Sequence, residues 1–184
     1  RNALYWGEPS AYDEIDITVI PDPNSRAIAF ETGAIDLIYG VDGPISPDNF
    51  RRFRAKPLIN AGLSKPMETR LIALNSNRGP TQDIAVRRAI NHAIDKDMLI
   101  SAVLYDTETR ADMLYASNVP YADVGLVPYA YDPKKSVELL EKSGWVLEQG
   151  RTVRRRAGAV LNVDLVFIGT DAISKSIAEI IQAE

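Results

Sequence analysis

Hydrophobic positions in the first part of the chain predict two strands and a helix between them. Residues 15–20 (Ile-Asp-Ile-Thr-Val-Ile) alternate apolar and polar side chains, and residues 35–39 (Ile-Asp-Leu-Ile-Tyr) form a second short apolar run. The intervening residues 26–32 predict a short helix with Asn24 or Ser25 as its N-cap. Strand, helix and strand in this order make a βαβ unit, which is typical of a mostly parallel sheet covered by helices.

The rest of the chain combines further strands with longer helical patterns. A strand is predicted over 69–75, and a hairpin is predicted from 151–155 and 160–168. An aspartate stands at or just before the start of each other predicted helix: 48–54, 83–94, 95–103, 132–144 and 172–184. The last of these ends without Gly, Asn or Pro, which is typical of a segment cut from a longer protein. The predicted fold class is α/β, with mixed helices and strands.

Composition narrows the function classes. The chain of 184 residues suits one large domain or two small ones. With 21 Lys+Arg against 25 Asp+Glu, the net charge of −4 argues against the basic face that nucleic-acid binding requires. The absence of cysteine excludes disulfides, thiolate zinc sites and cysteine nucleophiles. No apolar run approaches the ~20 residues that span a bilayer.

The sequence offers few groups for catalysis or metal binding. His92 is the only histidine, and Asp95 is its nearest carboxylate at helical spacing. Two such groups are too few for a stable metal site, so we expect His92 to be a packing or surface residue and no metal ligand. No Gly-x-Ser-x-Gly motif presents a serine nucleophile. Paired carboxylates for a hydrolase remain an open alternative, because no motif selects two of the acidic residues.

Three other segments have both a structural and a functional interpretation. Arg154-Arg155-Arg156 is expected to be a solvated end of the hairpin. The Tyr- and Pro-rich segment 115–131 is either a ligand wall or a loop anchored to the surface by its aromatic side chains. Gly169-Thr170-Asp171 precedes a helix, so it caps that helix and can also offer backbone N–H groups to an anion.

Several blocks of residues together resemble the family 5 extracellular solute-binding proteins, the receptors of ABC importers for peptides, nickel and related solutes. The blocks are Arg1-Asn2 with Tyr5-Trp6-Gly7, Val19-Ile-Pro-Asp-Pro-Asn-Ser-Arg-Ala27, Phe30-Glu-Thr-Gly-Ala-Ile-Asp-Leu-Ile-Tyr-Gly40, Ala73-Leu-Asn75, Val86-Arg-Arg-Ala-Ile-Asn91, Tyr131-Asp-Pro-Lys134, Leu139-Leu-Glu-Lys-Ser-Gly-Trp145 and Phe167-Ile-Gly-Thr-Asp-Ala172. The Ile-Pro-Asp-Pro and Phe-Ile-Gly-Thr-Asp-Ala stretches are similar in particular to nickel-binding members.

The resemblance implies a two-lobed periplasmic-binding-protein-like fold with solute between the lobes, of which this chain is a middle fragment. Residues 1–66 correspond to the end of the first lobe, and residues 67–184 to the first half of the second. The implied function is periplasmic capture of a small-molecule solute, nickel as a chelate, for an ABC permease in the membrane. Catalysis, a cofactor and nucleic acid are not implied. Oligopeptide or opine binding is the alternative within the family.

The resemblance also implies which residues contact the solute. The loop after the Gly-x-Ile-Asp segment maps to Tyr39 and Gly40, and the first strand of the second lobe places Arg70 toward the cleft. Arg70 departs from the apolar residue expected in the nickel-binding group. The loop before the last helix maps to Gly169, Thr170 and Asp171, in agreement with the argument from the helix start.

Overall fold

The computed structural model describes residues 4–8, 10–40 and 44–183. Predictions that involve Arg1-Asn2, the loop residues 41–43 or Glu184 lie outside the described residues.

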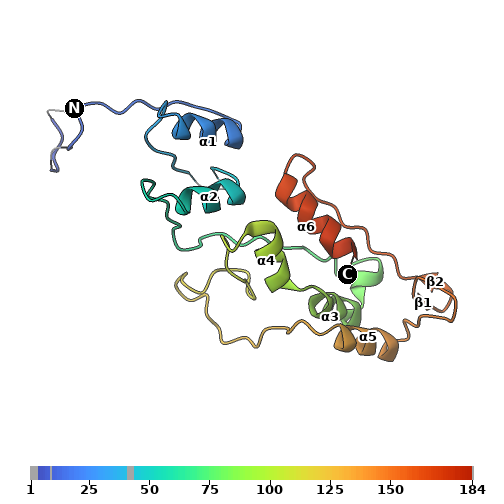
Figure 1. Cartoon of the computed structure of the whole chain (residues 1–184). Coiled ribbons are helices and arrows are strands. Elements are labelled where there is room, and N and C mark those ends of the chain that lie inside the picture. Colours follow the sequence, from blue (N-terminus) through green and yellow to red (C-terminus); the bar gives the residue numbers. More distant parts are fainter. Residues whose placement is uncertain (1–3, 9, 41–43, 184) are drawn as a thin grey trace. The chain divides into compact units, whose positions relative to one another are not determined.

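The chain divides into two compact units, residues 1–59 and 60–184, and each is described by itself (Figure 1). The units reflect packing within the chain, so the lobe boundary placed after residue 66 stays a prediction. The first unit contains α1 (Pro23–Glu31) and α2 (Pro47–Arg54). The second unit contains the 3₁₀ helix η1 (Pro80–Gln82), α3 (Ile84–Ala93), α4 (Lys96–Leu104), α5 (Pro133–Lys142), the short strands β1 (Arg155–Arg156) and β2 (Ala159–Val160), and α6 (Ala172–Ala183).

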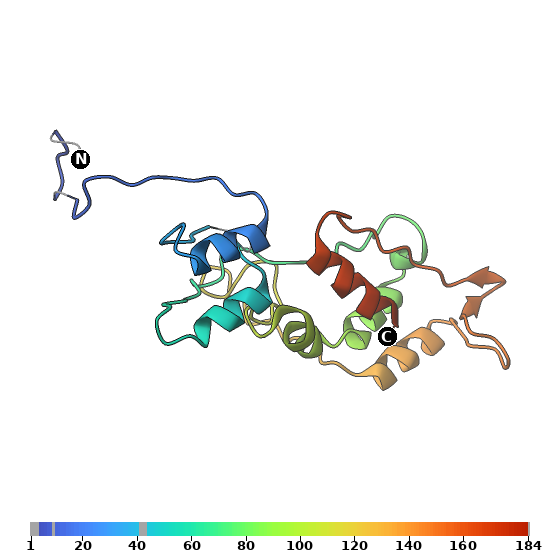
Figure 2. The same cartoon turned by 45° about the horizontal axis from the view of Figure 1, so that its top comes forward.

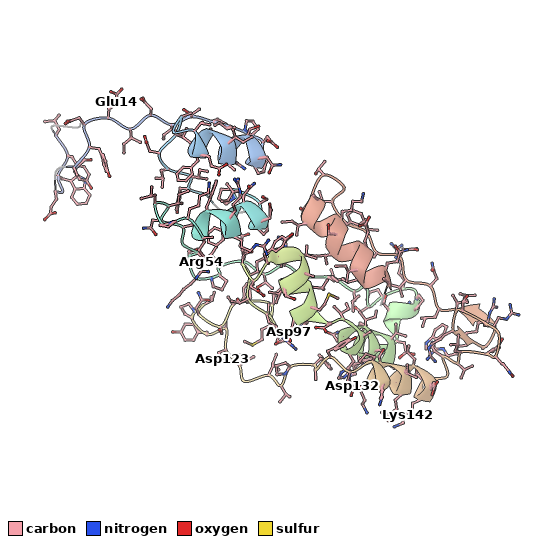
Figure 3. All side chains as sticks on the ribbon, viewed as in Figure 1. Glu14, Arg54, Asp97, Asp123, Asp132 and Lys142 are labelled. Atoms are coloured by element: carbon pink, nitrogen blue, oxygen red, sulfur yellow. The ribbon has the colours of Figure 1, made fainter. Side chains whose placement is uncertain are left out.

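Side-chain caps begin the helices, and most of the predicted starts are confirmed. Asp83 accepts the N–H of Ala85 at 2.8 Å to begin α3, and Asp95 accepts that of Met98 at 2.9 Å to begin α4. Asp132 accepts the N–H of Lys135 at 2.9 Å, and Figure 3 shows Asp132 and Lys142 at the two ends of α5.

The start predicted for α1 is wrong by three residues. Its N-cap is Asp22, which accepts the N–H of Ser25 at 2.7 Å, and Pro23 occupies the first turn. The Asp-Pro pair is the same start signal that correctly predicted α5, because proline has no N–H to leave unsatisfied at the first helical position. Asn24 and Ser25 therefore lie inside the helix.

The predicted parallel sheet is not formed among the described residues. Residues 15–20, 35–39 and 69–75 are not paired as strands, and of the predicted strand 160–168 only Val160 belongs to β2, with one further hydrogen bond from Leu161 to Arg154. A strand needs a neighbour for its backbone N–H and C=O groups, and no described segment lies in register with these residues. Ile15, Ile17 and Val19 accordingly stay exposed, at 72%, 86% and 84% of their surface.

The one described sheet is a hairpin that pairs Arg155 with Val160 and Arg156 with Ala159. Its turn residues, Ala157 and Gly158, both have positive φ, at 49° and 84°. Two positive φ values match the tight turn whose twist suits a hairpin, so the predicted turn position is confirmed. Figures 1 and 2 show this hairpin at the edge of the second unit.

The first unit packs α1 against α2 around one aromatic side chain. Phe53 is 2% exposed, and its ring centroid lies 5.4 Å from that of Phe30. At the rim, the Glu31 carboxylate accepts hydrogen bonds of 2.5 Å from both Lys56 and Arg52. The hydrogen bond from Lys56 is the largest cause that lowers the pKa of Glu31, and that from Arg52 is the second. Both hydrogen bonds connect α1 to the end of α2.

The second unit is built on the packing of α3 against α5 and of α4 against α6. Small side chains allow α3 and α5 to approach closely, since Ala89 and Ser136 are both buried. Leu99 of α4 and Ala178 of α6 are also buried. The longest helix, α6, has 12 residues, and none of the described helices has the length and apolar character needed to cross a membrane.

The arginine run 154–156 lies at the hairpin as predicted, and 42% of the Arg156 side chain is exposed, but the side chains also pack on the helices, which corrects the expectation of a simply solvated end. The Arg156 guanidinium lies 4.4 Å from the ring centroid of Trp145, which is only 3% exposed. It also donates to the carboxylate of Asp83 at 2.5 Å and to the carbonyl of Ser143 at 3.2 Å. Arg154 donates to the carbonyl of Trp145 at 3.1 Å. The hairpin is close enough to the helices for these long side chains to reach them.

We expect Arg156→Ala to lower the free energy of unfolding by about 1–2 kcal/mol, because it removes a cation–π contact and an ion pair that also joins the α3 cap. Urea unfolding followed by circular dichroism measures this difference. Arg151→Ala is the control, because its side chain is 58% exposed and its pair with Glu148 is 3.9 Å long. An equal effect of the two substitutions would contradict the packing role of Arg156.

Candidate functional site

Two of the predicted solute-binding residues, Arg70 and Asp171, lie together in the second unit. The Nη1 atom of Arg70 is 3.5 Å from the Oδ2 atom of Asp171, although 101 positions separate the two residues. Arg70 also donates from Nη2 to the Oε1 atom of Glu108 at 3.3 Å. The Arg70 cluster, defined as Arg70, Glu108 and Asp171, thus joins three separate segments of the chain.

Asp171 forms the N-terminal cap of α6. Its Oδ1 atom accepts the N–H of Ile173 at 3.0 Å, and its Oδ2 atom accepts the hydroxyl of Ser174. Its own N–H donates to the carbonyl of Ile168 at 3.0 Å, which closes a turn through Gly169 and Thr170. Asp171 therefore caps the helix, as predicted, and also contacts Arg70. The binding of an anion by backbone N–H groups of this loop stays a prediction.

The hydrogen bond from the Ser174 hydroxyl is the largest cause that lowers the pKa of Asp171. Partial burial opposes it, while the N–H groups of Ile173 and Ser174 and the charge of Arg70 lower the pKa further. Asp171 is therefore ionised at neutral pH, and the cluster contains one guanidinium and two carboxylates.

Sequence reasoning missed Glu108. It lies in the irregular segment after α4, 38 positions from Arg70, and no motif or helical spacing distinguishes it from the other acidic residues. An alternating or helical pattern would have predicted on which side of the segment Glu108 lies, but this segment has neither pattern. Only the path of the chain brings it to Arg70.

The remaining predicted residues are exposed. Tyr39 belongs to the first unit and is 90% exposed, and Gly40 follows it. Gly169 and Thr170 are exposed in the turn before α6. The roles of these four residues in contacting a solute stay predictions.

The predicted site residues do not line either of two open grooves among the described residues. One groove of about 560 Å³ lies in the first unit beside residues 56–59. The other, of about 450 Å³, lies in the second unit between α3, α5 and residues 161–163 and is mainly apolar. The side chains of Arg70 and Asp171 are partly exposed, at 43% and 35% of their surface.

His92 anchors a loop. Its Nδ1 atom is 2.7 Å from the carbonyl oxygen of Ala130, and because that oxygen can only accept, Nδ1 carries the proton. The imidazole meets the ring of Tyr129 edge-on at 5.3 Å, and the His92 carbonyl accepts the N–H of Asp132 at 2.8 Å. Asp95 instead caps α4. No group of three or more metal-binding side chains was found in the part of the chain that the structure describes.

Arg110 holds the two ends of the Tyr- and Pro-rich segment together. Its guanidinium donates to the carboxylates of Asp112 and Asp97, in each case at 2.9 Å, and to the carbonyl of Tyr129 at 3.0 Å. Figure 3 shows Asp97 on α4 and Asp123 out on the loop. Tyr121, in the middle, is fully exposed. These contacts favour the anchored-loop interpretation at the ends of the segment and leave its middle free for either interpretation.

The described carboxyl groups whose pKa is displaced are all displaced downward. Lys142 and Lys135 lower the pKa of Glu138 to about 2. Burial raises the pKa of Asp112, but Lys96 and Arg110 outweigh it and lower the pKa overall. A hydrolase that uses paired carboxylates needs one of them with a raised pKa to act as the general acid. None of these displaced groups has that property.

Comparison with known proteins decides the family. Residues 1–184 match the bacterial extracellular solute-binding proteins, family 5, in the region described as the middle. The chain belongs to this family. The resemblance drawn from the sequence blocks is confirmed, including its closeness to nickel-binding members.

Three relatives show how far the similarity extends. The nickel-binding periplasmic protein of Escherichia coli K12 is 52% identical over 184 residues, which are 100% of this chain and 35% of that protein. NikA from Brucella suis, in a crystal structure with Fe(III)-EDTA, is 58% identical with a TM-score of 0.92, over 97% of this chain and 36% of that chain. The periplasmic binding protein DppA from Helicobacter pylori, in complex with the peptide STSA, is 28% identical with a TM-score of 0.62, over 78% of this chain and 27% of that chain.

The chain therefore spans about a third of the length of these first relatives. The predicted fold class, a part of a two-lobed periplasmic binding protein with mixed helices and strands, is confirmed by these structural neighbours.

We expect Asp171→Asn to destabilise the chain at neutral pH, because it removes a negative charge that favours the start of α6. The loss should be only about 0.5 kcal/mol, because water screens this partly exposed carboxylate. The folded pKa of Asp171 lies below its ordinary value of 3.8, so its contribution is present above that pH and is lost as the pH falls through the folded value. Urea unfolding at neutral pH and at about pH 3 measures the loss. Glu179→Gln, the same charge change near the end of α6, is the control, and an equal loss in both variants would contradict the capping role of Asp171.

We expect Arg110→Ala to increase the rate of chymotrypsin cleavage after the exposed Tyr115 and Tyr121 roughly three- to tenfold, because local opening of the loop becomes easier. Mass spectrometry of the early fragments identifies the cleaved bonds. Arg151→Ala keeps the same number of protease sites and should leave the rate unchanged. Equal cleavage of the two variants would show that Arg110 does not close the loop.

Proposed function

We propose that this chain is part of the solute receptor of an ABC importer and that its solute is nickel carried as a chelate. The observation that supports this most strongly is the similarity along the whole chain to a nickel-binding periplasmic protein and to NikA. By the same argument the receptor works in the periplasm, has no catalytic role and delivers its solute to a membrane permease. The lowered carboxyl pKa values fit a role without general acid catalysis.

The proposed mechanism is capture by closure. A solute between two lobes stabilises the closed form by as much as its affinity for that form exceeds its affinity for the open form. The partial exposure of the Arg70 and Asp171 side chains, 43% and 35%, suits residues that a solute reaches before closure.

The predicted residues offer different chemistry to a solute. Tyr39 offers an aromatic face and a hydroxyl group, and Gly40 follows it. Arg70 offers guanidinium N–H groups, and the turn through Gly169 and Thr170 offers backbone groups beside Asp171, the cap of α6. Oxygen atoms of a chelator are suitable acceptors for these donors.

Peptide binding is a second candidate, and Arg70 is the observation that favours it. A charged side chain stands where the nickel-binding group leads us to expect an apolar one, and an arginine can bind peptide carbonyl or carboxylate oxygens. The relative from Helicobacter pylori was crystallised with a peptide. A panel of solutes therefore has to include short peptides.

The test is isothermal titration calorimetry on the complete natural gene product that carries this sequence, with nickel chelates and short peptides as ligands. We expect binding of a nickel chelate, and a roughly tenfold weaker binding by Arg70→Ala, because a charge-assisted hydrogen bond is lost. Arg151→Ala is the matched control and should bind like the natural protein. Binding of peptides with no binding of nickel chelates would replace the nickel proposal with the second candidate. Failure to bind any of these ligands would overturn the solute-receptor proposal.

A further inference from the structure

The charge around Arg70 is not that of a simple anion site. One guanidinium faces two carboxylates, those of Glu108 and Asp171, so the cluster as a whole is negative at neutral pH. A solute that places a carboxylate on Arg70 also brings that charge close to Glu108 and Asp171. Attraction and repulsion then nearly cancel, whereas an uncharged oxygen acceptor meets no such repulsion.

Arg70 nevertheless keeps the capacity to donate. A guanidinium carries five N–H groups, and the hydrogen bond to Glu108 is the one described for this side chain. The contact with Asp171 is 3.5 Å long, and 43% of the Arg70 side chain is exposed. A solute oxygen can therefore reach an N–H group of Arg70 while both carboxylates stay in place.

The two carboxylates differ in what else they do. Asp171 is committed to α6, because it accepts the N–H of Ile173 and the hydroxyl of Ser174. The described hydrogen bond of Glu108 goes to Arg70 alone. The charge of Glu108 can therefore change without removing a helix cap.

The segment that carries Glu108 is held by its neighbours and not by Glu108 itself. The hydroxyl of Thr107 donates to the carbonyl of Leu104 at 2.6 Å, and the Arg110 network holds the other side. A neutral side chain of the same shape at position 108 is therefore expected to stay beside Arg70.

We infer that Glu108 determines charge specificity in the proposed solute site, by offsetting the charge of Arg70 so that neutral solutes bind better than anionic ones. This inference rests on the proposed function and adds the class of solute that the site prefers. The ligand class is a neutral complex or molecule with oxygen acceptors.

The test uses Glu108→Gln in the complete natural gene product and two nickel probes that differ in charge. Nickel–EDTA is a dianion, and nickel with two histidines is neutral. We expect Glu108→Gln to increase the affinity for the dianion relative to the neutral complex roughly three- to tenfold, as Coulomb interactions across a partly hydrated contact allow. The increase should shrink in high salt, because the contact is half-exposed.

Two further variants separate this effect from a general change in charge. Glu141→Gln removes a similar half-exposed carboxylate, which is 3.5 Å from Arg154, and should leave the ratio of affinities unchanged. The double variant Arg70→Ala/Glu108→Gln should show a smaller gain over Arg70→Ala, because without Arg70 the solute is no longer held beside residue 108.

The outcomes distinguish this inference from the proposed function. If the natural protein binds a probe but Glu108→Gln and Glu141→Gln change the ratio equally, or not at all, the role of Glu108 is wrong and solute capture stands. A gain that is undiminished in the double variant also overturns the role of Arg70 in holding the solute beside Glu108. If neither probe binds to any variant, the nickel proposal fails, and this inference fails with it.

Discussion

The contact of Arg156 with Trp145 and Asp83 is the interaction on which the second unit depends. Trp145 directly follows the glycine that ends α5, Asp83 caps α3, and Arg156 belongs to the hairpin. One guanidinium therefore connects the start of one helix, the end of its neighbour and the only described sheet. Burial raises the pKa of Asp83, but the N–H of Ala85 and the charge of Arg156 outweigh it and lower the pKa overall, so the carboxylate stays charged in both roles.

From this contact the structure extends to the candidate site in steps. The orientation of α3 places His92, which binds the backbone of Ala130 and Asp132 and so fixes where the Tyr- and Pro-rich segment ends. Arg110 then joins that end to the start of the segment and to α4. Glu108 lies two residues before Arg110, so its place beside Arg70 depends on the same network.

Local signals predicted the helices well, and the strands poorly, for a physical reason. A cap such as Asp132-Pro133 satisfies backbone groups within a few residues, so the sequence contains all that the helix start needs. A strand satisfies its backbone only through another strand, and the alternation in residues 15–20 does not say which segment that is. The arginine run was misjudged similarly, because its partner Trp145 belongs to a different segment.

In the candidate site, too, the sequence does not show which distant side chains come into contact. Asp171 was predictable because it caps a helix, and Arg70 was predicted from family resemblance, but their contact is between distant segments. Glu108 has no local signature, yet it sets the charge that a solute would meet at Arg70. A positive residue in a binding site therefore does not by itself imply an anionic ligand: the carboxylates that share its guanidinium decide how much of its charge remains for the solute.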